Sequence, residues 1–390
     1  MANTRVYYAT QAVGLTPRNP GNTEGEAEQF PKGLQSVGIT TNFNLEQVFQ
    51  LGQLEIYDNV ENVPDVEVSL QKIADGSKFL YPICVEGTGT SAATVGDAFK
   101  KDIGAVSTNR VEVALRIYKD TSTDAFQDNA LGSEKPYGVV TCSGMYLSSV
   151  AYTIPVEGFI TEDVTLVGNS KIYTNDTAEG GGEGGAGSAD AGNTLSPKKI
   201  GRRINLSTLS VLPTGTPAGN TDADSGTMGA IAINTRDVPV GQSDQSGRPY
   251  LQNINVSMDL GREAVFELGK FSPYARYATF PIEVSSEFEV LAESHDQVQA
   301  KDFDDVNACS ATEIKNLDDH EIKLVICGSG SNDNYFIDLG KKNKLTSVNY
   351  SGGDTGGGNA TITYSYQTFN KFTVDASGSF VNTDVDIIQP

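Results

Sequence analysis

The sequence predicts a mainly β protein that contains two tandem, duplicated, strand-rich domains. Three observations predict this architecture. The stretch from Leu34 to Pro64 recurs at Leu251 to Pro281, apolar and polar residues alternate in both stretches, and a glycine-rich segment separates the two halves. Because a gapless repeat of this length rarely arises by chance, we interpret it as an internal duplication.

The two stretches align at a constant offset of 217 (251 minus 34) and share the pattern VFxLG. Conservative differences, such as Val37/Ile254 and Ile39/Val256, keep the apolar positions apolar. The identical pairs include Leu34/Leu251, Gln35/Gln252, Glu46/Glu263, Val48/Val265, Phe49/Phe266, Leu51/Leu268, Gly52/Gly269, Tyr57/Tyr274 and Pro64/Pro281.

Alternation with a period of two predicts half-buried strands, one at the start of each copy and one after its proline. The apolar sides are expected to comprise Val37, Ile39, Thr41, Phe43, Val66, Val68, Leu70, Ile254, Val256, Met258, Leu260, Ile282, Val284, Phe288 and Val290. The polar sides are expected to comprise Thr40, Asn42, Asn44, Glu67, Ser69, Gln71, Asn255, Ser257, Asp259, Glu283, Ser285, Glu287 and Glu289. A one-residue slip would bury these carboxylates, so the register is constrained.

Further elements follow in chain order. We expect strands at Arg5–Leu15, Phe79–Val85, Arg110–Tyr118, Tyr137–Thr153, Val164–Tyr173, Ile204–Leu212, Met228–Val238 and Glu321–Cys327, and helices at Ser91–Ile103 and Thr312–Leu317. Leu147–Tyr152 recurs at Leu345–Tyr350 with an offset of 198 (345 minus 147), so the duplication spans a whole domain. Gly180–Asn193 has no side chain able to pack and predicts a flexible linker outside the folded domains.

These elements divide the chain into four parts. We predict an N-terminal strand and arm over residues 1–33, a first domain over 34–175, a linker and insertion over 176–247, and a second domain over 248–390.

Composition excludes several classes of protein. The 390 residues carry 28 Lys plus Arg against 50 Asp plus Glu, a formal net charge of −22, which argues against tight DNA or RNA binding. None of the four cysteines forms a CxxC pair, so we expect buried free thiols rather than a zinc or redox site. The N-terminus does not resemble a signal peptide, and no apolar run is long enough to span a membrane.

The chain offers little that could perform catalysis, and we predict no catalytic, cofactor-binding or metal-binding residues. His295 and His320 are the only histidines, and the glycine-rich turn at Gly87 lacks the lysine of a phosphate-binding loop. The acidic loop Asn220–Gly226 lacks the bidentate acid of a calcium site. Asp302, Asp304 and Asp305 are read as a solvated charge run, and Lys198, Lys199, Arg202 and Arg203 as an ion-pairing interface.

The repeated blocks allow a family to be named. LQSVGITTNFNLEQVFQLGQLEIYDNVENVPDVEVSLQKIADG, with its partner LQNINVSMDLGREAVFELGKF, resembles the tail tube proteins of tailed bacteriophages, here in a form with two tube domains. The resemblance implies a β-sandwich or incomplete barrel with a short flanking helix in each domain. It further implies that neighbouring subunits join their strands into an inner barrel, and that rings stack into the conduit for DNA ejection.

The resemblance assigns roles to the polar side chains and to partners. The thirteen polar-side residues would line a lumen through which DNA passes without specific binding, since an acidic or neutral lining does not hold DNA. Solvent exposure of an ordinary antiparallel sheet would explain the same pattern. The main partner would be the chain itself, with tail sheath, baseplate and tail terminator proteins as further partners. The subunit would assemble in the host cytoplasm and reside in the virion tail, without a membrane.

Two tube domains in one chain predict a trimeric ring with pseudo-sixfold symmetry, because rings of this family are commonly built from six tube domains. A true hexamer, in which one domain lies outside the wall, is the alternative. Two other classes of function remain open. They are a tail-associated decoration or receptor-binding protein with tandem β-sandwiches, and a glycan-cleaving enzyme with paired carboxylates.

Overall fold

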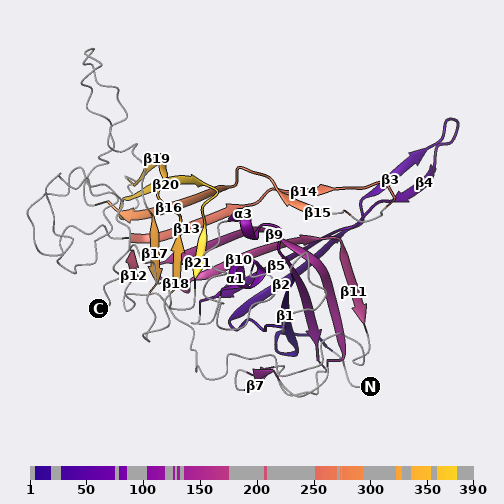
Figure 1. Cartoon of the computed structure of the whole chain (residues 1–390), viewed down its shortest axis with the longest axis horizontal. Helices are drawn as coiled ribbons and strands as arrows, with labels where there is room; N and C mark the ends of the chain where they lie inside the picture. Colours follow the sequence, from indigo (N-terminus) through magenta and orange to yellow (C-terminus); the bar gives the residue numbers. More distant parts are fainter. Residues whose placement is uncertain are drawn as a thin grey trace, which may run out of the picture. The chain divides into compact units, whose positions relative to one another are not determined.

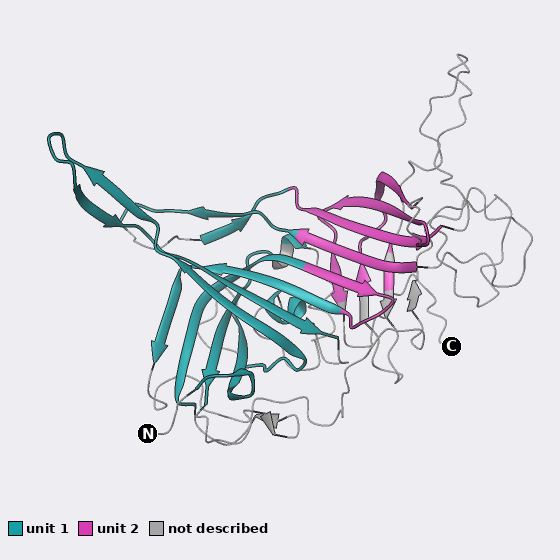
Figure 2. Cartoon of the chain, turned by 180° about the vertical axis from the view of Figure 1, so that it is seen from behind, with its two compact units in different colours: residues 1–150, 161–197, 259–280 teal, residues 151–160, 198–258, 281–390 magenta. Residues whose placement is uncertain are grey.

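The computed structural model confirms the mainly β class, with large antiparallel sheets and no closed barrel among the described strands. The chain forms two compact units (Figure 2): unit 1 comprises Met1–Val150, Thr161–Pro197 and Asp259–Phe280, and unit 2 comprises Ala151–Ile160, Lys198–Met258 and Pro281–Pro390. The structure describes residues 5–18, 28–74, 79–85, 103–118, 126–127, 130–131, 136–174, 206–208, 251–269, 273, 275–292, 322–326, 335–352 and 358–375.

Several predicted features lie outside the described residues. They are the linker Gly180–Asn193, the strand Met228–Val238, the helix Thr312–Leu317, nearly all of the helix Ser91–Ile103, both histidines, the turn at Gly87, the loop Asn220–Gly226, the acidic run around Asp304, the basic cluster around Lys199, Cys309 and Cys327.

The main sheet of unit 1 orders its strands β9 (Gly138–Pro155), β10 (Thr161–Gly168), β5 (Asp65–Ile73) and β2 (Leu34–Asn42) (Figure 1). Along β5 the predicted alternation is present: Val66, Val68 and Leu70 are buried, while Glu67 and Ser69 are exposed. The apolar side of this strand therefore forms part of the core, and the polar side faces solvent.

A second set of strands in unit 1 pairs β1 (Gln11–Arg18) with β6 (Arg110–Ile117), β6 with β9, and β9 with β11 (Ser170–Thr174). The long strand β9 thus takes part in both sets. Gly144 in β9 has a φ of 67°, a left-handed conformation that suits glycine, beside a register shift between Val111 and Val113 of β6. Such an irregularity increases the local bend and twist of a strand.

The remaining elements of unit 1 are short. A 3-10 turn, η1 (Tyr8–Thr10), precedes β1, so the predicted strand Arg5–Leu15 begins later than expected. The helix α3 covers Ile103–Val106, and the small strands β7 (Phe126–Gln127) and β8 (Ala130–Leu131) pair with each other.

The prediction of a strand at Phe79–Val85 is wrong, because Leu80–Val85 forms a helix, α1. The carboxylate of Glu162 accepts hydrogen bonds from the backbone N–H groups of Leu80, at 2.5 Å, and Tyr81, at 2.8 Å, at the helix start. All six helix residues are buried, and the helix contacts β1, β6 and β10. A short apolar run has no periodicity that separates a strand from a buried helix.

The main sheet of unit 2 orders β19 (Lys344–Ser351), β20 (Thr361–Phe369), β16 (Glu283–Leu291) and β13 (Leu251–Asp259). Its core includes Ile254, Val256, Phe288 and Tyr366, with the last two rings edge to face at 5.9 Å. A smaller sheet orders β12 (Leu206–Thr208), β17 (Lys323–Ile326), β18 (Tyr335–Asp338) and β21 (Thr373–Asp375).

The strand bounds repeat between the two copies of the motif. β2 and β13 begin 217 residues apart and have the same length. β5 and β16 are also equal in length but begin 218 residues apart (283 minus 65), so the second copy has one extra residue before its second strand. Whether the two units share one fold stays a prediction.

Candidate assembly surfaces

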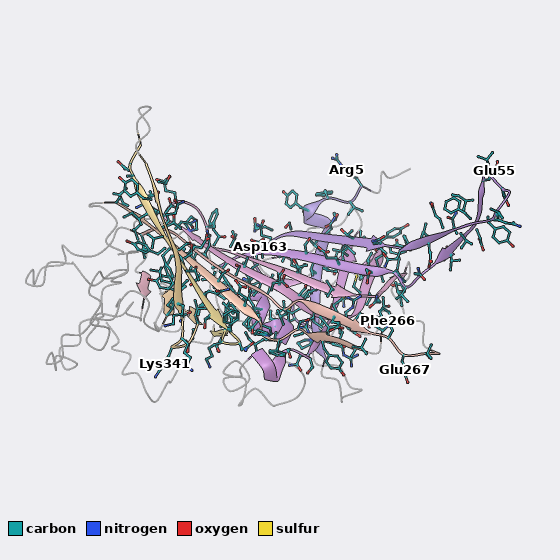
Figure 3. All side chains as sticks on the ribbon, turned by 90° about the horizontal axis from the view of Figure 1, so that it is seen from above. Arg5, Glu55, Asp163, Phe266, Glu267 and Lys341 are labelled. Atoms are coloured by element: carbon teal, nitrogen blue, oxygen red, sulfur yellow. The ribbon has the colours of Figure 1, made fainter. Side chains whose placement is uncertain are left out.

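The polar side of the unit 1 sheet carries the first group of predicted lumen residues. Thr40, Asn42, Glu67 and Ser69 are exposed, and Asn44 and Gln71 are half-buried. Cross-strand pairing places Thr40 opposite Glu67, and Asp163, labelled in Figure 3, opposite Gln71. These side chains form a solvent-facing surface that carries hydroxyl, amide and carboxylate groups.

The second group lies on the polar side of β13 and β16. Ser257, Asp259, Glu283 and Glu287 are exposed, and Asn255, Ser285 and Glu289 are half-buried. The hydroxyl groups of Ser257 and Ser285 are hydrogen-bonded at 2.8 Å across the two strands. Glu287 and Glu289 lie opposite Ser365 and Thr363 of β20. All thirteen predicted residues therefore keep solvent contact, and their lining of a shared lumen stays a prediction.

Two strands mark the outer edges of these sheets. Among the described strands, β2 pairs only with β5, and β19 pairs only with β20. In unit 2, β13 is not an edge strand, because it lies between β16 and the end of β9. Just after that end, Val156 N–H donates to the carbonyl of Gln252 at 2.9 Å. An open strand edge is a template for pairing with another chain.

The first hairpin, β3 (Leu45–Phe49) with β4 (Ile56–Glu61), exposes every residue of both strands and extends away from the sheets of unit 1 (Figure 1). Its tip residues Leu51 and Leu54 are fully exposed. The exposed apolar side chains of this hairpin are Leu45, Val48, Phe49, Leu51, Leu54, Ile56, Tyr57 and Val60. An isolated two-stranded hairpin is only marginally stable in water, and an exposed apolar surface of this kind is typical of interaction sites.

The second hairpin pairs β14 (Arg262–Val265) with β15 (Ala275–Ala278) and belongs to unit 1. Its outer end, where Phe266 and Glu267 are labelled in Figure 3, is exposed, as is Leu268. Its strands differ from those of the first hairpin, because Arg262 and Ala264 in β14 and Ala275 and Arg276 in β15 are half-buried.

Arg276, which lies opposite Ala264, anchors the second hairpin to a polar network in unit 1. Its guanidinium lies 2.6 Å from the Asp65 carboxylate and 3.1 Å from the side-chain oxygen of Asn169. Asn44 donates to the same carboxylate at 2.8 Å, and Asn169 donates to the carbonyl of Pro64 at 2.7 Å. Partial burial raises the pKa of Asp65, but hydrogen bonds from Asn44 and Arg276 and the charge of Arg276 outweigh it, so the net shift is downward.

Arg262 provides a second anchor. Its Nε donates to the carbonyl of Leu147 at 2.6 Å, and its Nη1 donates to the carbonyl of Ser107. The guanidinium carbon lies 5.3 Å from the centroid of the Tyr146 ring, a cation–π contact. Burial lowers the pKa of Arg262 to about 10, against a smaller opposite effect of Tyr146, and the side chain remains charged at neutral pH.

The sequence predicted no role for Arg262 or Asn169. The change of Asp58 and Asn59 to Ala275 and Arg276 in the second copy predicted only that the two lateral interfaces of a ring need not be alike. The partners of these arginines lie about 14 to 211 residues away in the chain, so their function as anchors follows only from the fold.

The two described cysteines are free, as expected. Cys84 and Cys142 are buried, and burial raises the pKa of both thiols, which keeps them protonated and unreactive. Within the described residues no three metal-ligating side chains gather, and no helix is long and apolar enough to cross a membrane.

No family model matches the chain, and no curated protein matches it in sequence. Among solved structures it is similar to a chain of the anti-feeding prophage baseplate, determined by cryo-electron microscopy with sixfold symmetrisation. The match covers 44% of this chain and 97% of that chain, at 12% identity and a TM-score of 0.27. A similarity of this extent does not establish a shared fold or function.

Proposed function

We propose that the protein is a structural virion protein, a phage tail tube subunit that polymerises as stacked rings into the conduit for DNA ejection. The observation that carries the proposal is that the outermost strands, β2 and β19, each pair on one side only within the described strands. The sequence resemblance to tail tube proteins and the water-facing polar side chains support it.

Strand addition would connect the subunits. In unit 2 the segment beside β13 belongs to the end of β9, and residues 151–155 correspond to 349–353 at the offset of 198. That range includes the end of β19, while β2 corresponds to β13. β2 of one subunit would therefore pair with β19 of the next subunit. This is a head-to-tail contact, and it closes into a ring at the correct rotation.

The ring formed in this way would be a trimer with pseudo-sixfold symmetry, since each chain contributes two strand sets. Its lumen would be lined by the polar side chains of both repeats of every subunit. Acidic lining residues would let DNA pass without binding to the wall. Each closed ring would also remove the exposed strand edges that otherwise favour aggregation.

Electron microscopy of the purified protein, with a glycan-cleavage assay, tests the function. Hollow tubes or stacked rings support the proposal, discrete oligomers favour a decoration or receptor-binding protein, and glycan cleavage would establish an enzyme. Reconstruction without imposed symmetry then decides the ring: six chains per ring, with one unit outside the wall, would refute the trimer.

A further inference from the structure

The two hairpins differ at two positions, one at the base and one within the strands, in a way that divides their roles. The second hairpin carries Arg262 and Arg276, whereas the first hairpin has Leu45 and Asn59 at the same positions of the repeat. The two arginines are half-buried, and their counterparts in the first hairpin are exposed. The divergence therefore falls on the residues that attach a hairpin to the protein body.

The arginines attach the second hairpin by directional, charge-assisted contacts. Arg276 bridges Asp65 and Asn169, with its side chain only 11% exposed. Arg262 donates to two backbone carbonyls and covers the ring of Tyr146. Such contacts are about twice as strong as neutral hydrogen bonds and depend on the planar guanidinium.

The first hairpin cannot make these contacts on unit 1 of its own chain, because the second hairpin occupies the carbonyls and the Tyr146 ring. Leu45 has no donor, and Asn59 has no charge. What the first hairpin offers instead is apolar surface, including Leu45 itself, which is 59% exposed.

The residue that corresponds to Tyr146 in the second repeat suits contact with a leucine in place of an arginine. At the offset of 198 it is Lys344, the first residue of the edge strand β19, and it is exposed. A lysine there would repel an arginine at position 45 but can cover a leucine with its aliphatic stem. Arg262 is therefore compatible with Tyr146, and Leu45 is compatible with Lys344. An arginine at position 45 would not be compatible with Lys344.

We propose that Arg262 and Arg276 are specificity-determining residues for self-assembly. They hold the second hairpin on unit 1 of its own chain, and their absence from the first hairpin directs that hairpin to the Lys344 region of a second copy of this chain. The second half of this inference rests on the proposed function, whereas the first half concerns a single chain. This difference in sequence prevents the two hairpins from competing for the same docking surface on unit 1.

Hydrogen exchange on the unassembled chain tests the first half. The double variant Arg262→Leu, Arg276→Asn gives the second hairpin the residues of the first, and protection in residues 262–278 should fall about tenfold or more. Protection in β5 and β10 should stay unchanged, which shows that the unit remains folded. Unchanged protection in the second hairpin would overturn the inference, whether or not tubes form.

Cysteine cross-linking between copies tests the second half. A Leu45→Cys chain mixed with a Lys344→Cys chain should give a disulfide-linked dimer absent from either variant alone. The matched control mixes Leu45→Cys with Tyr146→Cys and should give none. Tubes without the first cross-link, or a cross-link in the control, would overturn the inference while leaving the proposed function intact.

A charge substitution tests the specificity itself. Leu45→Arg should raise the critical concentration for assembly about tenfold more than the uncharged control Leu45→Gln, because the arginine faces Lys344. Added salt should narrow the difference, since it screens exposed charges. Equal effects of the two substitutions would overturn the assignment of Lys344 as the contact.

Discussion

Single side chains decide the local stability of unit 1, and Glu162 is the clearest case. It is fully buried, its carboxylate accepts the first two N–H groups of α1, and it lies directly opposite the fully buried Lys72 of β5. Buried charge is tolerated only where such partners satisfy it. Glu162 thus joins a helix and two strands that are distant in the sequence.

Glu162→Gln should destabilise unit 1 by about 3 kcal/mol, because it removes a buried charge opposite Lys72 and weakens the bonds that begin α1. Chemical denaturation measures the free energy of unfolding. Glu67→Gln, on the exposed side of β5, is the matched control and should change it by less than about 0.5 kcal/mol. A small effect of Glu162→Gln would show that the carboxylate is not required.

Asp65 predicts a pH dependence of the attachment of the second hairpin. Its pKa is lowered in the folded state, so its contribution to stability is fully present above the unfolded value of about 4 and is lost as the pH falls through the folded value. The protection factors of the amides in residues 262–278, which correct for the slower intrinsic exchange in acid, should therefore fall as the pH falls. Asp65→Asn should show low protection factors at neutral pH as well, and a parallel pH response of both proteins would contradict the assignment.

At the scale of elements, the first hairpin combines exposed strands with exposed apolar side chains. Leu51→Ser with Leu54→Ser should leave the thermal midpoint of the isolated chain unchanged, because both side chains are fully exposed. Assembly, followed by sedimentation, should decrease strongly, since the apolar contact with a second copy is lost. Undiminished assembly would exclude the hairpin tip from the contact.

The matched position in the second hairpin is Leu268, which is also fully exposed. Comparing the assembly of Leu268→Ser with that of Leu51→Ser distinguishes the contributions of the two hairpins to assembly. We expect the first-hairpin variant to reduce assembly more, because only that hairpin lacks the two arginine anchors.

At the scale of the whole molecule, the acidic polar sides predict how assembled tubes treat DNA. Glu67→Lys with Glu287→Lys should leave folding intact, since both side chains are exposed, but should make tubes retain short duplex DNA. The retention should fall steeply with salt. The control exchanges Glu55→Lys at the first hairpin tip, where no lumen is predicted, and retention by that control would contradict the lumen assignment.

The sequence predicted the strands β2, β5, β6, β9, β10, β13 and β16 well, because alternation with a period of two is a local signal that burial of one side imposes. It also identified the polar side chains that keep solvent contact. It mistook α1 for a strand, because a fully apolar run has the same composition in either form and only the distant Glu162 distinguishes them.

By itself, the sequence determined the mainly β class and the alternation along β5, β13 and β16, since these depend on residues close together in the chain, and the repeated motif can be seen by direct comparison. Only the tertiary structure decided which hairpin is anchored. Arg276 and Asp65 are 211 residues apart, and a contact of that range depends on how strands pair and bend, which no local pattern encodes. The difference between Arg276 and Asn59 is, in the folded protein, part of the difference between an anchored hairpin and an exposed one.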